Sequence, residues 1–246
     1  MNSIFFGGFW QATFLLFTVV QDICIYLENN MPENISYRNI SHIYYCCRGR
    51  KDVAQNLLAW QKSRAISSDE TLRAFSDIYI YGKKIIDSEV FDFSFEQVHH
   101  YYLSVGEHTL HVALYALGVA YRIQKNGKKI NLRDIVISSL CHDLGIIKRH
   151  EKFENNIVCC YLHPVHSLKI AKKLIPDLSA DAEKAILRHM FPLLPLPPLS
   201  RTGIILVNAD KVCSVSELKT AHDFKSADRL SISTNLHSLF SRFFYH

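Results

Sequence analysis

The stretch SSLCHDLGIIKRH, residues 138–150, reads as an apolar helix until an imidazole and a carboxylate interrupt it. These residues, His142 and Asp143, are adjacent, and neighbouring residues of an α-helix point about 100° apart. Burying either group without a partner costs several kcal/mol. Two divalent ions about 3.5 to 4 Å apart could satisfy both directions, with Asp143 bridging them and His142 on one ion. The pair therefore predicts a dinuclear metal site.

Two helices are predicted from the residues upstream of this stretch and within it. The first begins near His108 and stops at residues 126–127, Asn-Gly, because glycine suits the left-handed C-cap of a helix. Asn131, followed three residues later by Asp134, is typical of an N-cap. His108 is therefore expected at the start of one helix, and the His-Asp pair near the end of the next.

Two further histidines are expected at helix ends downstream. His163 precedes Pro164, and proline is favoured in the first turn of a helix, so His163 is predicted at the cap of a third helix. Ser179 is predicted to open a fourth helix that runs through Ala182 to His189. Each histidine would then lie at the edge of a helix, where its ring can reach neighbouring helices.

The sequence PLLPLPP, residues 192–198, is predicted to be a rigid extended crossover, because so many prolines exclude a helix. A last core helix is expected after it, with Ile204, Val207 and Asp210 on one face. Earlier in the chain, Asp52 and Ser68 are predicted to cap two packing helices. No alternating strand pattern longer than a few residues occurs, so the predicted fold class is all-α.

Composition and charge exclude some functions. Hydrophobic residues make up 48% of the 246 residues and charged residues 21%, which is ordinary globular usage. The net charge of +5 is mild, and basic residues are scattered except for the cluster Arg48, Arg50 and Lys51. No basic stripe indicates binding to a nucleic-acid polymer, whereas a small, negatively charged substrate is easier to accommodate.

The seven cysteines give an odd count with two vicinal pairs, at residues 46–47 and 159–160, and no CxxC spacing. This pattern argues against a disulfide framework or a zinc ribbon. Free thiols pack like small hydrophobic groups and persist in reducing compartments. The cysteines are therefore predicted to be reduced and the protein to be cytoplasmic.

The N-terminal segment is almost wholly apolar over residues 4–20, a length near the lower limit for a membrane span. No Lys or Arg precedes Arg38, which disfavours a secretory signal peptide. Three interpretations stay open: a membrane contact or span through residues 4–20, a buried or oligomer-forming helix, and a leader upstream of a start at Met31. The oligomeric state is equally open.

Five predicted helical segments each carry a histidine or aspartate that would suit a shared site. A mixed set of neutral imidazoles and carboxylates suits transition metals better than it suits magnesium or calcium. The candidate metal ligands are His108, His142, Asp143, His163, His189 and Asp210.

The ordered motifs CHDLG, LHP, RHMFPL and NADK resemble the HD superfamily of metal-dependent phosphohydrolases. The resemblance is closest to variants with additional histidines, the HDIG and HD-GYP cyclic-dinucleotide phosphodiesterases, and it covers roughly residues 100–218. It implies a helical bundle in which His108, His142, Asp143 and Asp210 hold one metal, while Asp143, His163 and His189 hold a second. It also implies phosphoester hydrolysis by metal-activated water.

On this basis the chain divides into a hydrophobic segment at 1–30, a helical lead-in at 31–98, an HD-type metal-binding domain at 99–220 and a tail at 221–246. The expected cofactors are two divalent transition-metal ions, with Fe or Mn favoured, while Zn, Co or Ni would also fit the ligands. The expected substrate is a nucleotide or a cyclic nucleotide-like phosphoester.

Two departures from the HD-GYP enzymes bear on the substrate. These enzymes carry a lysine three residues after the aspartate, where this chain has Ile146, and the GYP signature is missing. A second His-Asp pair, at residues 222–223, lacks ordered partners and is expected to have no role. The substrate class therefore stays open between dinucleotides, nucleoside phosphates and other phosphoesters.

Several other residues are candidates for contact with the reacting phosphate. Lys148, Arg188 and Lys211 could bind it, with Lys148 also a catalytic candidate, although a solvated helix charge is the favoured interpretation of each. His111, one turn after His108, could support the metal site, act as a general acid or be a surface histidine without a role. His99 and His100 are assigned no role.

Two alternative functions fit the same residues. The ligand set is also similar to HD-fold diiron oxygenases, which use O₂ to cleave carbon bonds. A non-catalytic HD module could instead bind a nucleotide as a sensor.

Overall fold

The computed structural model describes residues 37–64, 66–99 and 103–228, with only the backbone path given for 37–40 and 219–228. The hydrophobic segment at 1–30, residue His100 and the tail beyond residue 228 lie outside the described residues, as do the side chains of residues 222–223. Within the described ranges, no helix combines the length and the apolar character needed to cross a membrane.

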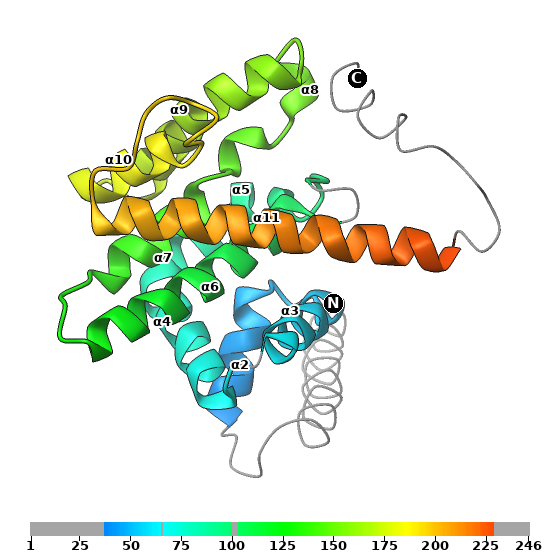
Figure 1. The fold of residues 1–246 in the computed structure, drawn as a ribbon, viewed down its shortest axis with the longest axis vertical. Helices are drawn as coiled ribbons and strands as arrows, with labels where there is room; N and C mark the ends of the chain where they lie inside the picture. The colour runs from blue at the N-terminus through cyan, green and yellow to red at the C-terminus, as the bar shows by residue number, and fades with distance from the viewer. Residues whose placement is uncertain (1–36, 65, 100–102, 229–246) are drawn as a thin grey trace, which may run out of the picture. The chain divides into compact units, whose positions relative to one another are not determined.

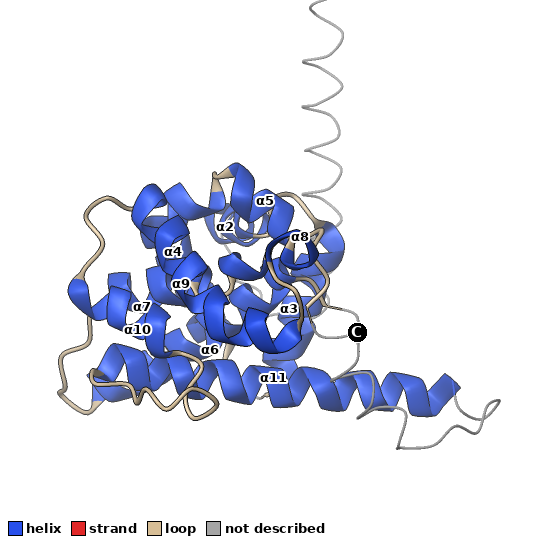
Figure 2. Ribbon diagram, turned by 90° about the horizontal axis from the view of Figure 1, so that it is seen from above, coloured by secondary structure: helices blue, strands red, loops and turns tan. Residues whose placement is uncertain are grey.

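The all-α prediction is confirmed: the described residues form helices joined by loops, with no named strand (Figure 2). The chain divides into two compact units, and the boundary falls between Tyr79 and Ile80, within one helix. Residue 99, where the metal-binding domain was expected to begin, therefore lies inside the second unit. The six cysteines in the described part of the chain are free thiols.

The first unit contains α2 (Tyr37–Cys46), α3 (Lys51–Ser63) and most of α4 (Ser68–Ile86). Its core includes the fully buried side chains of Ile43, Leu57 and Phe75. The two predicted caps are each displaced by a residue or two. Arg50 is the N-cap residue of α3, with Asp52 in the first turn, and the Glu70 N–H donates to Ser67, not Ser68.

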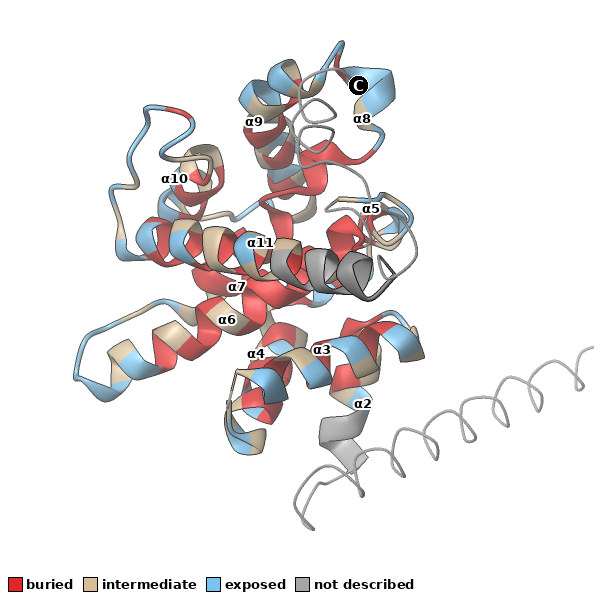
Figure 3. Cartoon of the chain, turned by 45° about the vertical axis from the view of Figure 1, so that its right-hand side comes forward, coloured by how far each residue is buried: buried red, intermediate tan, exposed pale blue. Residues whose placement is uncertain are grey.

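The second unit continues from α4 through the helices that carry the predicted site (Figure 1). In chain order these are α5 (Glu89–Ser94), α6 (Val105–Lys125), α7 (Leu132–Cys141), the 3₁₀ turn η1 (Leu144–Ile146), α8 (Arg149–Lys152), α9 (Asn156–Leu174), α10 (Ala180–Arg188) and α11 (Arg201–Asp228). Helix α7 contacts α6, α9, α10 and α11, so it occupies the centre of this unit. Buried residues accordingly concentrate on α6 and α7 (Figure 3).

Helix α6 begins earlier than predicted. Ser104 and Glu107 form a reciprocal capping box, in which the Ser104 side chain accepts from the Glu107 N–H and the Glu107 carboxylate accepts from the Ser104 N–H. His108 therefore lies inside the first turns of α6 instead of at its start. The helix ends as predicted, with Asn126 as the C-cap and Gly127 at φ 76°.

Helix α9 corrects the prediction for the LHP motif. Asn155 caps this helix by accepting a hydrogen bond of 2.9 Å from the Val158 N–H, so the helix starts well before His163. Pro164 lies inside the helix, where it removes one backbone donor without ending the helix. The Asn155 cap outweighs the local preference of proline for a first turn, and it places His163 in the middle of α9.

The remaining helix starts agree with the sequence. Asn131 caps α7 through the Asp134 N–H, and Ser179 caps α10 through the Ala182 N–H. Residues 192–198 are non-helical as predicted, although the segment opens in a turn and a bend, and only residues 196–198 have no assigned secondary structure.

The predicted buried face of α11 is wrong at Ile204, which is 56% exposed, while Asp210 is buried as expected. Ile204 lies six residues before Asp210, so the two side chains point about 120° apart around the helix. The face that is buried with Asp210 instead carries Leu206, Cys213 and Glu217.

Candidate metal centre

The second unit brings all six predicted ligand residues together. His108 comes from α6, His142 and Asp143 from the end of α7, His163 from α9, His189 from the C-cap of α10, and Asp210 from α11. All six side chains are buried, with 6% or less of each exposed. Five helices therefore contribute to one polar cluster inside an otherwise apolar core.

Asp143 lies between two groups of imidazoles. Its Oδ2 atom is 3.5 Å from His142 Nε2 and 3.8 Å from His108 Nε2. Its Oδ1 atom is 3.3 Å from the Nε2 atoms of both His163 and His189. The two carboxylate oxygens therefore face different pairs of histidines.

The first group, called the Asp210 triad, consists of His108, His142 and Asp210. Asp210 Oδ1 lies 3.4 Å from His108 Nε2 and 4.0 Å from His142 Nε2. Ligands of a tetrahedral ion with bonds of about 2.1 Å lie about 3.4 Å apart. Together with Asp143 Oδ2, the triad could therefore hold a divalent ion after small movements.

The second group, called the Asp143 triad, consists of Asp143, His163 and His189. The Nε2 atoms of His163 and His189 are 2.9 Å apart. Two ligands at right angles on an ion with bonds of about 2.1 Å would be about 3.0 Å apart. The spacing of these three donors therefore also suits a metal ion.

The hydrogen bonds of three of the histidines leave their Nε2 atoms available to bind a metal ion. The Nδ1 atoms of His142, His163 and His189 each lie 2.6–2.9 Å from a carbonyl oxygen of the same helix. A carbonyl can only accept, so each Nδ1 carries a proton, and in the neutral ring Nε2 then carries a lone pair. The acceptor carbonyls belong to Ser139, Cys159 and Ile186, in that order.

The positions of these Nε2 lone pairs suit bound cations. The buried Nε2 atom of His142 has no hydrogen-bond partner among the described residues. The facing lone pairs of His163 and His189 would repel each other at 2.9 Å unless a proton or a metal ion lay between them. An ion at the Asp210 triad would give His142 Nε2 a partner, and an ion at the Asp143 triad would relieve the repulsion between His163 and His189. The residues present therefore fit divalent transition-metal ions.

Burial and charge set the protonation of the ligands. Burial lowers the pKa of His142 to about 4, so the ring is neutral at pH 7. Burial opposes ionisation of Asp143 and Asp210, but the surrounding histidines hold the pKa of both carboxyls well below the usual range. Neutral imidazoles and ionised carboxylates are the forms that bind divalent metals.

His108 differs because it faces more negative charge. Burial acts to lower its pKa, but the carboxylates of Glu217, Asp210 and Asp143 outweigh burial and hold the pKa of His108 well above its usual value. A divalent ion would supply the positive charge that these carboxylates otherwise draw from a proton.

Glu217 is a residue of the cluster that the sequence analysis missed. Its carboxylate is buried, with Oε2 lying 2.8 Å from His108 Nδ1 and Oε1 lying 2.9 Å from His111 Nδ1. A carboxylate behind a ligating histidine fixes the ring and its tautomer. The available signal was its position seven residues, or two turns, after Asp210 on α11.

Gly145, two residues after Asp143, occupies a position that has no room for a side chain. A Cβ atom here would overlap the carbonyl oxygen of His163 and lie 2.7 Å from the backbone nitrogen of Ser167. The Gly145 N–H donates to Ser167 Oγ at 2.9 Å. Glycine therefore lets the 3₁₀ turn η1 approach α9 closely, which brings Asp143 beside His163.

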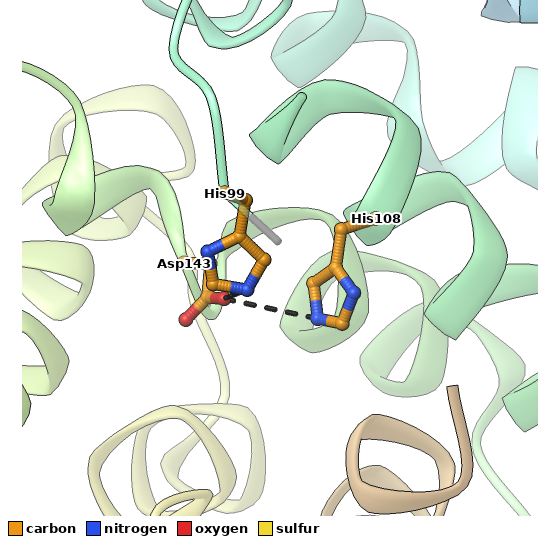
Figure 4. Close-up of side chains that lie close together, drawn as sticks. All are labelled: His99, His108 and Asp143. Carbon is orange, nitrogen blue, oxygen red and sulfur yellow. Dashed lines mark ion pairs between the residues drawn. The ribbon is translucent and has the colours of Figure 1, made fainter. Parts of the chain in front are cut away.

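His99 also reaches the cluster, although the sequence analysis assigned it no role. Its Nε2 atom lies 3.3 Å from Asp143 Oδ2, next to His108 (Figure 4). His99 precedes α6 in an irregular segment, so no helical period could have aligned it with the other histidines.

The three candidate phosphate-binding residues have different surroundings. Lys211 Nζ lies 2.8 Å from Asp210 Oδ2, at the edge of the cluster. The Arg188 guanidinium donates to the Pro197 carbonyl at 2.8 Å, and Lys148 is an exposed residue whose Nζ lies 3.9 Å from Glu151. These contacts place Lys211 next to a predicted ligand.

Comparison with known protein families identifies the part of the chain in which the cluster lies. Residues 105–214 match the family model of the HD domain, a superfamily of metal-dependent phosphohydrolases. The matched range contains all six predicted ligands, whereas His99 and Glu217 lie outside it. No curated protein and no solved structure matches the chain. The chain therefore carries an HD domain over residues 105–214.

Proposed function

We propose that this protein is a metal-dependent phosphohydrolase that cleaves a small phosphoester, of nucleotide or cyclic nucleotide-like type, with two divalent ions. The observation that carries the proposal is the position of Asp143, whose two oxygens face separate groups of imidazole nitrogens. A carboxylate placed in this way suits the bridge of a dinuclear centre. The full ligand set also supports a relationship to the HDIG variants with additional histidines.

The mixed nitrogen and oxygen ligands favour transition metals, with Fe or Mn preferred and Zn, Co or Ni also compatible. Such ions lower the pKa of bound water towards about 7 and polarise phosphoryl oxygens. The residues that would hold one ion are His108, His142, Asp143 and Asp210, and those that would hold the other are Asp143, His163 and His189.

The neighbouring residues divide into supporting and substrate-binding roles. Glu217 holds Nδ1 of His108, so it would keep the ring oriented towards the centre. His111 shares the same carboxylate, which favours a supporting role over that of a general acid.

Lys211 is the strongest candidate to bind a phosphoryl oxygen. Its ammonium group is partly exposed and contacts Asp210 directly, so it lies where the cluster meets solvent. Lys148 and Arg188 would contact only more distant parts of a substrate. The ammonium group of Lys148 lies near Glu151, and the guanidinium group of Arg188 is bonded to the 192–198 segment.

A panel of phosphomonoesters, phosphodiesters and nucleotides tests this proposal with protein loaded with Mn or Fe. The wild-type protein should release product from at least one class of phosphoester, and Asp143→Asn should abolish turnover because it removes the bridging charge. Asp181→Asn, an exposed residue in the first turn of α10, is the matched control and should retain activity.

Three results would contradict the proposal. Equal turnover by Asp143→Asn would exclude the bridging role of Asp143. O₂-dependent product formation by the iron-loaded protein, without phosphate release, would favour the oxygenase alternative. Tight nucleotide binding without product would favour a sensor.

A further inference from the structure

His99 contacts the cluster in the same way as the predicted ligands. Its Nε2 atom lies 3.3 Å from a carboxylate oxygen of Asp143, the same separation that His163 and His189 have from the other oxygen. Its ring centroid lies 4.6 Å from that of His108, compared with 4.9 Å between His163 and His189. In Figure 4 the rings of His99 and His108 both lie beside the Asp143 carboxylate.

The backbone holds His99 in this position through specific contacts. The His99 N–H donates to the Leu103 carbonyl at 2.8 Å, and the Val105 N–H donates to the Gln97 carbonyl at 2.9 Å. The Gln97 side-chain oxygen also accepts from the Lys148 N–H at 3.0 Å. The segment before α6 is therefore attached both to α6 itself and to the chain that follows the His-Asp pair.

His99 differs from the other histidines of the cluster in its exposure. Its side chain is 12% exposed, whereas those of His108 and His142 are fully buried. His99 therefore lies on the side of the cluster that is nearer to solvent. Its contact with Asp143 Oδ2 places it on the same side of the carboxylate as the Asp210 triad.

Counting lone pairs determines how many ions this arrangement could hold. The ligand atoms of His99, His108 and Asp143 lie within 4.8 Å of one another, as do those of the Asp210 triad. Both groups use Nε2 of His108, which has a single lone pair and can bind only one ion. The two groups therefore describe one ion with an added ligand, not two separate ions.

We propose that His99 is a further metal ligand, which donates its Nε2 lone pair to the ion of the Asp210 triad from the solvent side. This inference rests on the metal centre proposed above. It adds a ligand from outside the residues that match the HD domain. The alternative for the same geometry is that His99 only donates a hydrogen bond to Asp143.

Two substitutions at His99 separate these roles. His99→Ala removes the imidazole, whereas His99→Gln keeps an N–H donor but replaces the imidazole with a poor metal ligand. His150→Ala is the matched control, since His150 is an exposed histidine on α8. Each protein is loaded with Co(II), and the measurements are its visible absorption spectrum and the affinity of each ion in competition with a chelator. Circular dichroism checks that each variant is folded.

The ligand role predicts that His99→Ala and His99→Gln both weaken one of the two ions by at least about tenfold and alter the Co(II) spectrum. His150→Ala should match wild type in both measurements. Wild-type affinity and spectrum in His99→Gln, with weakened binding in His99→Ala, would show a hydrogen-bond donor and overturn the inference. Wild-type behaviour in both His99 variants would overturn it while leaving the dinuclear centre intact. Wild-type protein that binds no cobalt would overturn the metal centre itself.

Discussion

The Asp143 carboxylate faces the histidines of both the Asp210 triad and the Asp143 triad, but the two triads orient their histidines differently. In the Asp143 triad, backbone carbonyls of α9 and α10 hold the Nδ1 atoms of His163 and His189. In the Asp210 triad, a backbone carbonyl holds His142, but the side chain of Glu217 holds His108. Half of the centre is thus oriented by secondary structure, while the other half depends partly on a distant side chain.

This difference determines which substitutions can damage each half. A backbone carbonyl remains when a neighbouring side chain is replaced, so the ring orientations of His163 and His189 should not depend on any one neighbouring side chain. The Asp210 triad should lose affinity when Glu217 changes, although Glu217 contacts no expected ion. The two halves should therefore respond separately to chosen substitutions.

The largest effect should come from Asp143→Ala, because both halves use this carboxylate. We expect loss of both ions and of all turnover, measured by elemental analysis and by phosphate release. Asp181→Ala is the control and should retain wild-type metal content. An Asp143→Ala protein that kept both ions would show that the two ions do not share Asp143 as a ligand.

His189→Ala should remove one ion and leave the other. The substitution takes a ligand from the Asp143 triad only, so the Asp210 triad keeps its own three residues. Elemental analysis should give about half the wild-type metal content. Loss of both ions would mean that the halves bind cooperatively and cannot be treated separately.

Glu217→Gln should weaken the ion of the Asp210 triad by about 10- to 100-fold, because the amide orients His108 less strongly than a carboxylate does. The ion of the Asp143 triad should keep its affinity in the same chelator competition. Glu151→Gln, at an exposed site on α8, serves as control. Equal weakening of both ions would contradict the separation of the halves.

Gly145→Ala should have a smaller effect, on stability first. The added methyl group would meet the His163 carbonyl and the backbone of Ser167, so η1 and α9 must move apart. Overpacking of this kind costs about 1–3 kcal/mol, which urea unfolding of the metal-free protein would measure. Unchanged stability would show that the two segments can separate freely.

The sequence predicted those features whose signals are local. Asn131 and Ser179 each cap a helix with their own side chains, so the starts of α7 and α10 could be located without knowledge of the fold. The ordered histidines and aspartates then identified which helices must converge. The convergence of the six residues in one buried cluster follows that expectation.

The features that the sequence analysis missed depend on competition between local signals or on contacts between residues that are far apart in the sequence. The start of α9 was misplaced because the Asn155 cap outweighs the turn preference of Pro164. The face of α11 was rotated because an apolar residue, Ile204, is exposed. Glu217 lies two turns beyond Asp210 on α11, so the helical period was an available signal that the sequence analysis did not use. His99 lies in an irregular segment before α6, where periodicity carries no information.

The most direct test of the central claim is anomalous X-ray diffraction from crystals of the Mn- or Fe-loaded protein. The dinuclear account predicts two anomalous peaks, one on each side of the Asp143 carboxylate, next to the Asp210 triad and the Asp143 triad. A single peak, or none beside Asp143 in crystals of loaded protein, would contradict the claim that this carboxylate bridges two ions.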